Sequence, residues 1–334
     1  MRAAVILGLG CSPKNLKPFQ TDRNIEWRMG MPSAGDAADV ILLFGGDGTV
    51  HRHLGALVRL ALPVMVVPVG SGNDFARALG LRRVRDSLAA WQKFCAGAGN
   101  VQAIDLGVVT PLESADGSAS TAPQGRSIHE LAGDSRPDSR YFSCVAGIGL
   151  DSEVARRAGR LPRWLRGHGG YALTLAPTIF RFAPFRMKIS APLEGIGVEG
   201  DERLAGGIEG SAKNESWTAR SDRPTILAAF ANGPVYGGGM KIAPRAKMDD
   251  GLLDVCVVAG VGPFKLFCLF PTVYYGRHLG IREVSYFSVS RARVQTETPL
   301  DVYADGEYVC QTPVEVGIQQ GALRAIVHSS QTSF

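Results

Sequence analysis

Two glycine-rich segments of this 334-residue chain have the composition of phosphate-binding turns. Gly45-Gly46-Asp47-Gly48-Thr49 follows the apolar run Val40–Phe44, and Gly70-Ser71-Gly72-Asn73-Asp74 follows the apolar run Val64–Val67. Glycine allows positive φ and carries no Cβ, so successive backbone N–H groups can point at an anion placed at the N-terminus of the next helix. Neither the Walker nor the dinucleotide-binding fingerprint occurs. Taken alone, each segment fits an ordinary turn with a helix-capping Asp or Asn equally well.

Two Asp-Gly sequences in the second half of the chain could supply carboxylates. Asp249-Asp250-Gly251 follows Lys247, and Asp305-Gly306-Glu307 separates the short runs Leu300–Tyr303 and Tyr308–Gln311. Phosphoryl transfer depends on positioning and charge neutralisation, usually with a divalent metal, and a carboxylate near an alcohol can accept its proton. Asp-Gly also favours tight turns and hairpins, so both sequences have a purely structural alternative.

The elements that would position these residues fall into two groups. Strand-type runs and helical periodicity alternate through the first hundred residues, with the N-terminal apolar run as first strand and helices over Val50–Leu62 and from Phe75 to Leu79. This pattern is typical of a layered α/β domain. From about Ile104 alternating strands predominate, which predicts an antiparallel β-domain. The predicted strands there are Thr225–Ala231, Leu252–Val258, Tyr286–Gln295, Asp301–Tyr303 and Ala322–Val327.

Two helices and two loops are predicted inside the β-region. The helices run from about Gly169 to Phe182 and from about Pro263 to His278. Pro111–Arg140 and Glu194–Arg223 are rich in small and polar residues and are expected to be exposed, mobile loops.

Composition excludes several classes of protein. The formal charge of +5, from 36 Lys and Arg against 31 Asp and Glu, is too small for a dedicated nucleic-acid binder. Apolar runs fall short of the roughly 18–20 residues that span a bilayer. Six scattered cysteines suggest neither a zinc site nor a disulfide framework, but buried free thiols in a reducing cytoplasm.

In order and spacing, four segments together resemble the diacylglycerol kinase catalytic-domain family, which includes bacterial lipid kinases, sphingosine kinases and ceramide kinases. They are GGDGT at 45–49, PVGSGNDFAR at 68–77, YGGGM at 236–240 with DDGLLD at 249–254, and DGE at 305–307. The resemblance extends from about residue 40 to residue 328. It implies a nucleotide-binding α/β domain, here residues 1–104, followed by a β-sandwich substrate and metal domain, residues 105–330.

The resemblance also implies roles for particular residues. The turn from Gly45 to Thr49 and the Ser71 hydroxyl would contact ATP, as would Gly72 and Asn73. Asn73 and Asp74 would shape the second turn. Asp250 would hold Mg²⁺ together with the main chain of Lys247 and Leu252. Glu307 would accept the proton of the alcohol, and Asp305 would organise the metal and phosphate region. Where many relatives have Asn-Glu after GGDGT, this chain has His51-Arg52; we expect His51 to lie on the helix surface rather than to catalyse.

The segment Arg156–Lys188 contains eight basic residues, no acidic residue, and interleaved aromatics. Such a segment could lie on an anionic membrane, or it could be a solvated face with core aromatics. The aromatic helix at 263–278 could share the membrane surface or pack in the core. No nucleic-acid motif accompanies these residues. We expect a cytoplasmic protein at the inner membrane face, and the sequence leaves a homodimer open.

The sequence therefore predicts an ATP- and Mg²⁺-dependent kinase that phosphorylates a lipid hydroxyl, diacylglycerol-like or sphingoid-like. Two alternatives remain. An NAD-kinase-like phosphotransferase shares GGDGT, although the second turn and YGGGM favour lipid kinases. A non-catalytic nucleotide or lipid sensor is the other, against which the retained Asp250, Asp305 and Glu307 argue.

Overall fold

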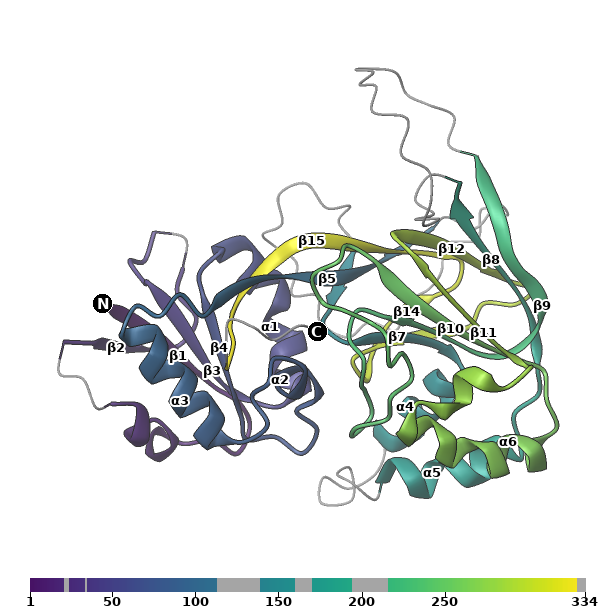
Figure 1. Ribbon diagram of the computed structural model, residues 1–334, viewed down its shortest axis with the longest axis horizontal. Helices are drawn as coiled ribbons and strands as arrows, with labels where there is room; N and C mark the ends of the chain where they lie inside the picture. Colours follow the sequence, from purple (N-terminus) through teal and green to yellow (C-terminus); the bar gives the residue numbers. More distant parts are fainter. Residues whose placement is uncertain (21–23, 34, 113–138, 160–169, 194–215, 329–334) are drawn as a thin grey trace.

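A computed structural model describes residues 1–20, 24–33, 35–112, 139–159, 170–193 and 216–328 (Figure 1). Its first part is a parallel sheet with the strand order β2 (Glu26–Met29), β1 (Arg2–Leu7), β3 (Val40–Gly45) and β4 (Val64–Pro68). The accompanying helices are α1 (Asp47–Leu60), α2 (Asp74–Ala78) and α3 (Val84–Cys95). Every residue of β3 and β4 is buried, as their continuous apolar sequences predict. The two strand–turn–helix units are thus confirmed.

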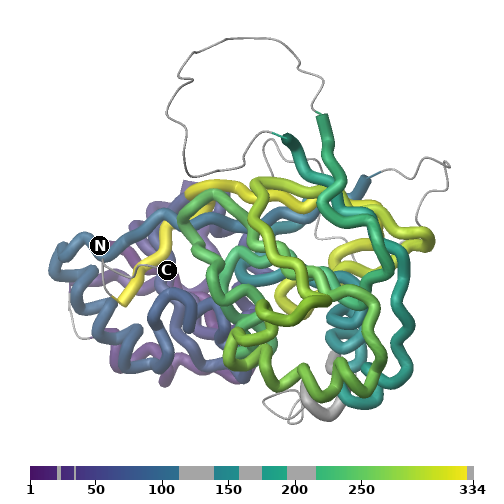
Figure 2. Tube along the Cα trace, turned by 45° about the vertical axis from the view of Figure 1, so that its right-hand side comes forward, coloured from purple at the N-terminus to yellow at the C-terminus, as the bar shows by residue number. Residues whose placement is uncertain are grey.

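Two long strands connect this sheet to the rest of the molecule. β5 (Val101–Pro111) and β15 (Val314–Ile326) pair antiparallel, and β15 also joins the parallel sheet where Ala325 lies beside Val64 of β4. Figure 2 shows the C-terminal segment running back into the N-terminal part. The predicted division between residues 104 and 105 lies within β5 and stays a prediction.

The second part is the predicted antiparallel β-sandwich with a core of its own, in which Phe142, Met187 and Phe230 are fully buried. The fold class is therefore confirmed. In addition to β5 and β15, its strands are β6 (Arg140–Phe142), β7 (Val145–Gly149), β8 (Phe185–Pro192), β9 (Trp217–Ala231), β10 (Leu253–Ala259), β11 (Val284–Val289), β12 (Arg291–Thr296), β13 (Asp301–Ala304) and β14 (Glu307–Gln311).

Two predictions for this part were wrong in detail. The segment 286–295 is not one strand: the chain breaks at Ser290, because β11 pairs with β10 whereas β12 pairs with β8 and β15. The predicted loop 194–223 ends in strand, since residues 217–223 belong to β9 and pair with β8. Tertiary pairing overrides their polar composition. Residues 113–138 and 194–215, the remainder of the two predicted loops, lie outside the described residues.

Three helices pack together beside the sandwich, namely α4 (Leu150–Gly159), α5 (Gly170–Ile179) and α6 (Pro263–Leu269) (Figure 1). The predicted helix from 263 to 278 is shorter than expected, because Pro271 lacks the N–H that would continue it; 3-10 turns follow at Phe270–Tyr275 and Arg277–Gly280. Within the described chain, no helix is both long and apolar enough to cross a bilayer.

The six cysteines are free, as predicted. Burial was predicted for all of them, but it holds for only Cys144 and Cys256, while Cys95 and Cys268 are exposed.

Candidate functional site

The two glycine turns face each other at the ends of β3 and β4. A Cβ on Gly70 would lie 2.4 Å from Cα of Gly46, so this approach requires glycine. Asn73 closes the second turn: its Oδ1 accepts from the Gly70 N–H at 3.0 Å, and its Nδ2 donates to the Gly70 carbonyl at 2.7 Å. Asn73 itself has φ of +64°, a conformation that Asn tolerates better than most residues. Its side chain therefore shapes the turn instead of capping α2.

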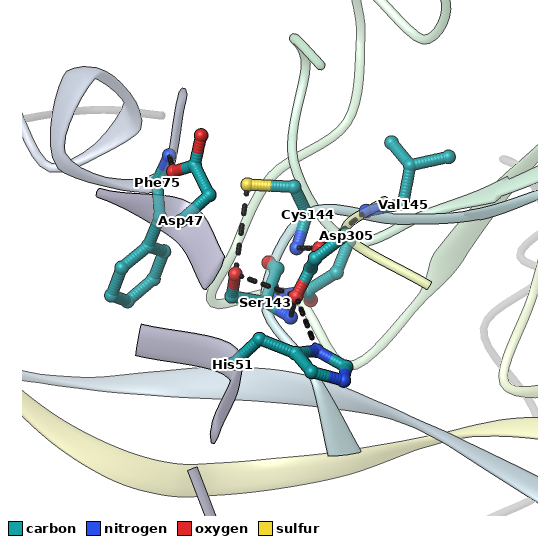
Figure 3. Close-up of polar contacts among 8 residues, drawn as sticks. Asp47, His51, Phe75, Ser143, Cys144, Val145 and Asp305 are labelled. Carbon is teal, nitrogen blue, oxygen red and sulfur yellow. Dashed lines mark hydrogen bonds and ion pairs between the residues drawn. The ribbon is translucent and has the colours of Figure 1, made fainter. Parts of the chain in front are cut away.

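Asp47 links the first turn to the helix after the second. Its carboxylate accepts the backbone N–H groups of Asp74 at 3.0 Å and Phe75 at 3.1 Å (Figure 3). Asp47 thus caps helix α2 rather than α1, the helix in which it lies. Burial raises the pKa of Asp47 to about 6, with further contributions from the negative charges of Asp74 and Asp305, which the two N–H groups only partly offset. The negative charge of the Asp47 carboxylate is therefore destabilised in the folded protein.

Asp305 occupies the tip of the β13–β14 hairpin and has the opposite electrostatic character. Its carboxylate, 1% exposed, accepts N–H bonds from Ser143, Cys144 and Val145 at 2.7, 2.8 and 3.3 Å, and the Ser143 hydroxyl at 3.0 Å (Figure 3). Burial alone would raise the pKa of Asp305. The hydrogen bond and charge of His51, together with these N–H groups, hold the pKa below its ordinary value.

His51 is not the surface residue that the sequence predicts. Its Nδ1 lies 3.3 Å from Oδ2 of Asp305, and its side chain is only 14% exposed. The contact joins α1 to a hairpin 254 residues further along the chain. A single His in a helix carries no signal of such a distant partner.

Glu307 lies beside the first glycine turn. Its Oε1 is 3.3 Å from the position that a Cβ on Gly48 would occupy. The structure thus brings together the GGDGT turn, the second turn and the DGE hairpin, which the sequence places far apart. The Glu307 side chain is exposed, so it is accessible to a substrate.

The loop from Lys247 to Leu252 is held in place by a residue that sequence reasoning missed. Asp105, in β5, accepts the Gly251 N–H and the Gly321 N–H, each at 2.7 Å, while its own N–H donates to the Met248 carbonyl at 2.7 Å. A lone Asp between Ile104 and Leu106 was the available signal, because a buried carboxylate in an apolar strand requires partners.

Asp250 stands on this loop with its carboxylate exposed. One of its oxygens accepts the Leu252 N–H at 3.1 Å. Partial burial raises its pKa, as do the charges of Asp254, Asp105 and Asp249, while the Leu252 N–H opposes the rise. A bound cation would relieve this repulsion. Mg²⁺ takes oxygen ligands, usually one or two carboxylates of the protein together with several water molecules. No cluster of three or more His, Cys, Asp or Glu suited to a metal occurs in the part of the chain that the structure describes.

An apolar pocket opens between the helices α4–α6 and the sandwich. It encloses about 760 Å³ of space between atoms, a volume that includes open solvent at its mouth. Its walls include Leu150, Val154, Leu175, Leu266 and Phe270.

The polar end of this pocket adjoins the second glycine turn. Asp151 lines the pocket and accepts the Tyr236 hydroxyl at 2.9 Å. Two residues further, the Gly238 N–H donates to the Asp74 carboxylate at 2.8 Å. The YGGGM segment therefore joins the pocket to the second glycine turn.

Comparisons with known proteins agree with this arrangement. Residues 14–109 match the diacylglycerol kinase catalytic domain, and residues 144–327 match the YegS C-terminal NAD kinase beta sandwich-like domain. A diacylglycerol kinase of Mycobacterium tuberculosis is 30% identical over 290 residues, covering 86% of this chain and 76% of that protein. A diacylglycerol kinase of Bacillus subtilis is 24% identical, covering 83% and 74%. A crystal structure of a diacylglycerol kinase from Bacillus anthracis superposes with a TM-score of 0.58 at 18% identity, covering 98% of this chain and 96% of that one.

Fold, turns and matches define the class of this protein: it is a kinase that uses ATP to phosphorylate an alcohol group. Within that class, the chain belongs to the diacylglycerol kinase catalytic-domain family.

Proposed function

We propose that this chain transfers the γ-phosphate of ATP to the hydroxyl of a diacylglycerol-like or sphingoid-like lipid whose hydrocarbon chains occupy the apolar pocket. The observation that carries the proposal is the continuity between pocket and turns: Tyr236 contacts the pocket carboxylate Asp151, and Gly238 contacts Asp74 of the second turn. A lipid with its tails between α4 and α6 would present its polar end toward the nucleotide.

The nucleotide would be bound by the facing turns. Backbone N–H groups of residues 45–49 would bind the phosphates, because the glycines leave room for close approach and the helix α1 begins there. Ser71, Gly72 and Asn73 would complete the site on the opposite side. These contacts would lie on residues 1–104, and those to lipid on residues 105–330.

Glu307 would accept the proton of the lipid hydroxyl as its oxygen attacks the γ-phosphorus and ADP leaves. Asp305, fixed by three N–H groups and His51, would keep the hairpin and hence Glu307 in place. Asp250 and the main-chain oxygens of Lys247 and Leu252 would hold Mg²⁺, which when bound neutralises phosphate charge.

Labelled ATP with Mg²⁺, a panel of lipids and NAD tests this function. The Glu307→Gln variant is compared with Glu297→Gln, which changes an exposed glutamate outside the site. We expect label in lipid with the unmodified chain and Glu297→Gln, and a loss on the order of 10²–10⁴-fold in turnover with Glu307→Gln at unchanged ATP affinity. Formation of NADP without labelled lipid would replace the proposal by an NAD-kinase activity, and nucleotide binding without transfer by a sensor.

A further inference from the structure

Helix α6 has apolar side chains on two sides. Leu266 and Leu269, together with Phe270 directly after the helix, line the pocket. Phe264 and Phe267 are instead 72% and 45% exposed. A short helix that only closed a pocket would need apolar residues on one side alone. Packing in the core therefore does not explain the apolar side chains on the second side of α6.

The exposed aromatic residues continue beyond α6. Phe180, just after α5, is 54% exposed, and its ring centroid lies 5.8 Å from that of Phe267. Tyr274 and Tyr275, in the 3-10 turn after α6, are 40% and 74% exposed. We call these residues together with Phe264 the aromatic surface. Scattered single apolar residues are normal on proteins, but a cluster of large ones marks an interaction site.

The segments that carry the aromatic surface are rich in positive charge. The two segments that form it, 170–192 and 261–283, contain six Lys or Arg residues and one acidic residue, Glu283. Of these, Lys265 and Arg186 are in ion pairs with acidic residues of neighbouring strands or turns. The other exposed cations among them include Arg181, Arg277 and Arg282.

We propose that the aromatic surface docks on an anionic lipid bilayer, so that the pocket on the other side of α6 lies next to the membrane. Phenylalanine and tyrosine rings suit the boundary between headgroups and acyl chains, and nearby arginines are attracted to anionic headgroups. A second copy of the chain fits less well, because two such cationic surfaces would repel each other. That docking brings the pocket to its substrate rests on the proposed lipid-kinase function. Docking on the bilayer itself does not depend on that function.

The position of this surface differs from the sequence expectation. The basic segment 156–188 left a membrane contact and a solvated face open as alternatives; Arg156 and Arg157 pair with Glu153 at 2.7 Å, and residues 160–169 lie outside the described chain. The exposed aromatic residues of α6, which the sequence left as an alternative to core packing, carry the stronger signal.

Co-sedimentation of the purified full chain with vesicles of phosphatidylcholine, with and without phosphatidylglycerol, tests the proposal. The double variant Phe264→Ser/Phe267→Ser is compared with Leu9→Ser/Met29→Ser, which removes two exposed side chains of the N-terminal part, 72% exposed in the turn after β1 and 56% exposed at the end of β2. We expect the first double variant to lose at least tenfold in partitioning onto anionic vesicles and the control to bind like the unmodified chain. Unmodified binding should weaken with salt and without phosphatidylglycerol.

Two further measurements separate this proposal from its alternatives. Thermal unfolding of both double variants shows whether they fold, and turnover on detergent-dispersed lipid should stay close to that of the unmodified chain. Loss of vesicle binding in a chain that phosphorylates no lipid would leave docking supported and the proposed function refuted. Equal vesicle binding by both double variants would overturn the docking surface. The proposal would also be overturned if the unmodified chain bound no vesicles and formed a dimer that only the Phe264→Ser/Phe267→Ser variant dissociated into monomers.

Discussion

Replacing Asp47 by Asn should make the free protein more stable while it impairs the kinase. The carboxylate is buried beside Asp74 and Asp305, and its pKa rises from the ordinary 3.8 to about 6. Each unit of pKa corresponds to about 1.4 kcal/mol, so keeping Asp47 ionised at neutral pH costs the folded state about 3 kcal/mol. Asn removes this charge at nearly constant size.

The amide of the Asp47→Asn variant recovers less than the whole of this free energy of about 3 kcal/mol. Both Asp47 oxygens accept backbone N–H groups at the start of α2, whereas Asn offers one acceptor and turns an NH₂ group toward the other N–H. The loss of one such bond costs about 1 kcal/mol. We therefore expect the free energy of unfolding at neutral pH to increase by about 2 kcal/mol.

The pH dependence provides the sharper test. Because the pKa of Asp47 is higher in the folded than in the unfolded state, the folded state holds the extra proton between about pH 4 and 6, and this part of stability is lost as the pH rises through that window. Asp47→Asn should thus be about 1 kcal/mol less stable than the unmodified chain at low pH, where only the lost hydrogen bond counts, and should gain about 3 kcal/mol, to an advantage of about 2 kcal/mol, toward neutral pH. Urea unfolding across this range measures it, with the exposed acid Asp36 changed to Asn as control. An advantage that does not change with pH would refute the reasoning.

Three other changes test the geometry of the site. Gly70→Ala should weaken ATP binding at least tenfold by calorimetry, because its Cβ would lie 2.4 Å from the facing turn, whereas Gly280→Ala has open space and should bind normally; equal affinities would contradict the facing-turn site. Asp105→Asn should lower the free energy of unfolding by about 1–3 kcal/mol in urea, since an amide cannot accept both N–H groups, and an unchanged midpoint would show that the anchor is dispensable. His51→Phe should raise the pKa of Asp305 and move the acidic limb of kcat to higher pH, with His51→Asn, which keeps a donor, recovering part of the shift; identical profiles would remove His51 from the site.

Local rules account for the part of the site that the sequence predicts. The runs at β3 and β4 are apolar throughout, and each is followed by glycines and a helical period, so strand, turn and helix follow from neighbouring residues. The hairpin at Asp305 is predicted in the same way by its Asp-Gly. These rules do not contain the approach of the two turns, which is so close that a Cβ on Gly70 would lie 2.4 Å from Cα of Gly46, or the position of Glu307 beside Gly48.

Long-range pairing explains what the sequence could not predict. β5 and β15 connect the two parts because segments about two hundred residues apart pair along most of their length. Asp105 holds the Asp250 loop only by virtue of that pairing, since one of its partners is Gly321 in β15. His51 meets Asp305 for a similar reason, and a pattern search along one helix has no access to either contact.

The contrast between the two buried carboxylates suggests how the site divides its tasks. Three backbone N–H groups and His51 stabilise the charge of Asp305, so that residue gains nothing from a ligand and is suited to hold the hairpin of Glu307 in one position. The charge of Asp47 is destabilised in the free protein by burial and by its acidic neighbours. A cation entering with the nucleotide would offset that cost, so part of the free energy stored at Asp47 would become available for binding. If so, the pKa of Asp47 should fall when Mg²⁺ and ATP bind, while that of Asp305 should change little.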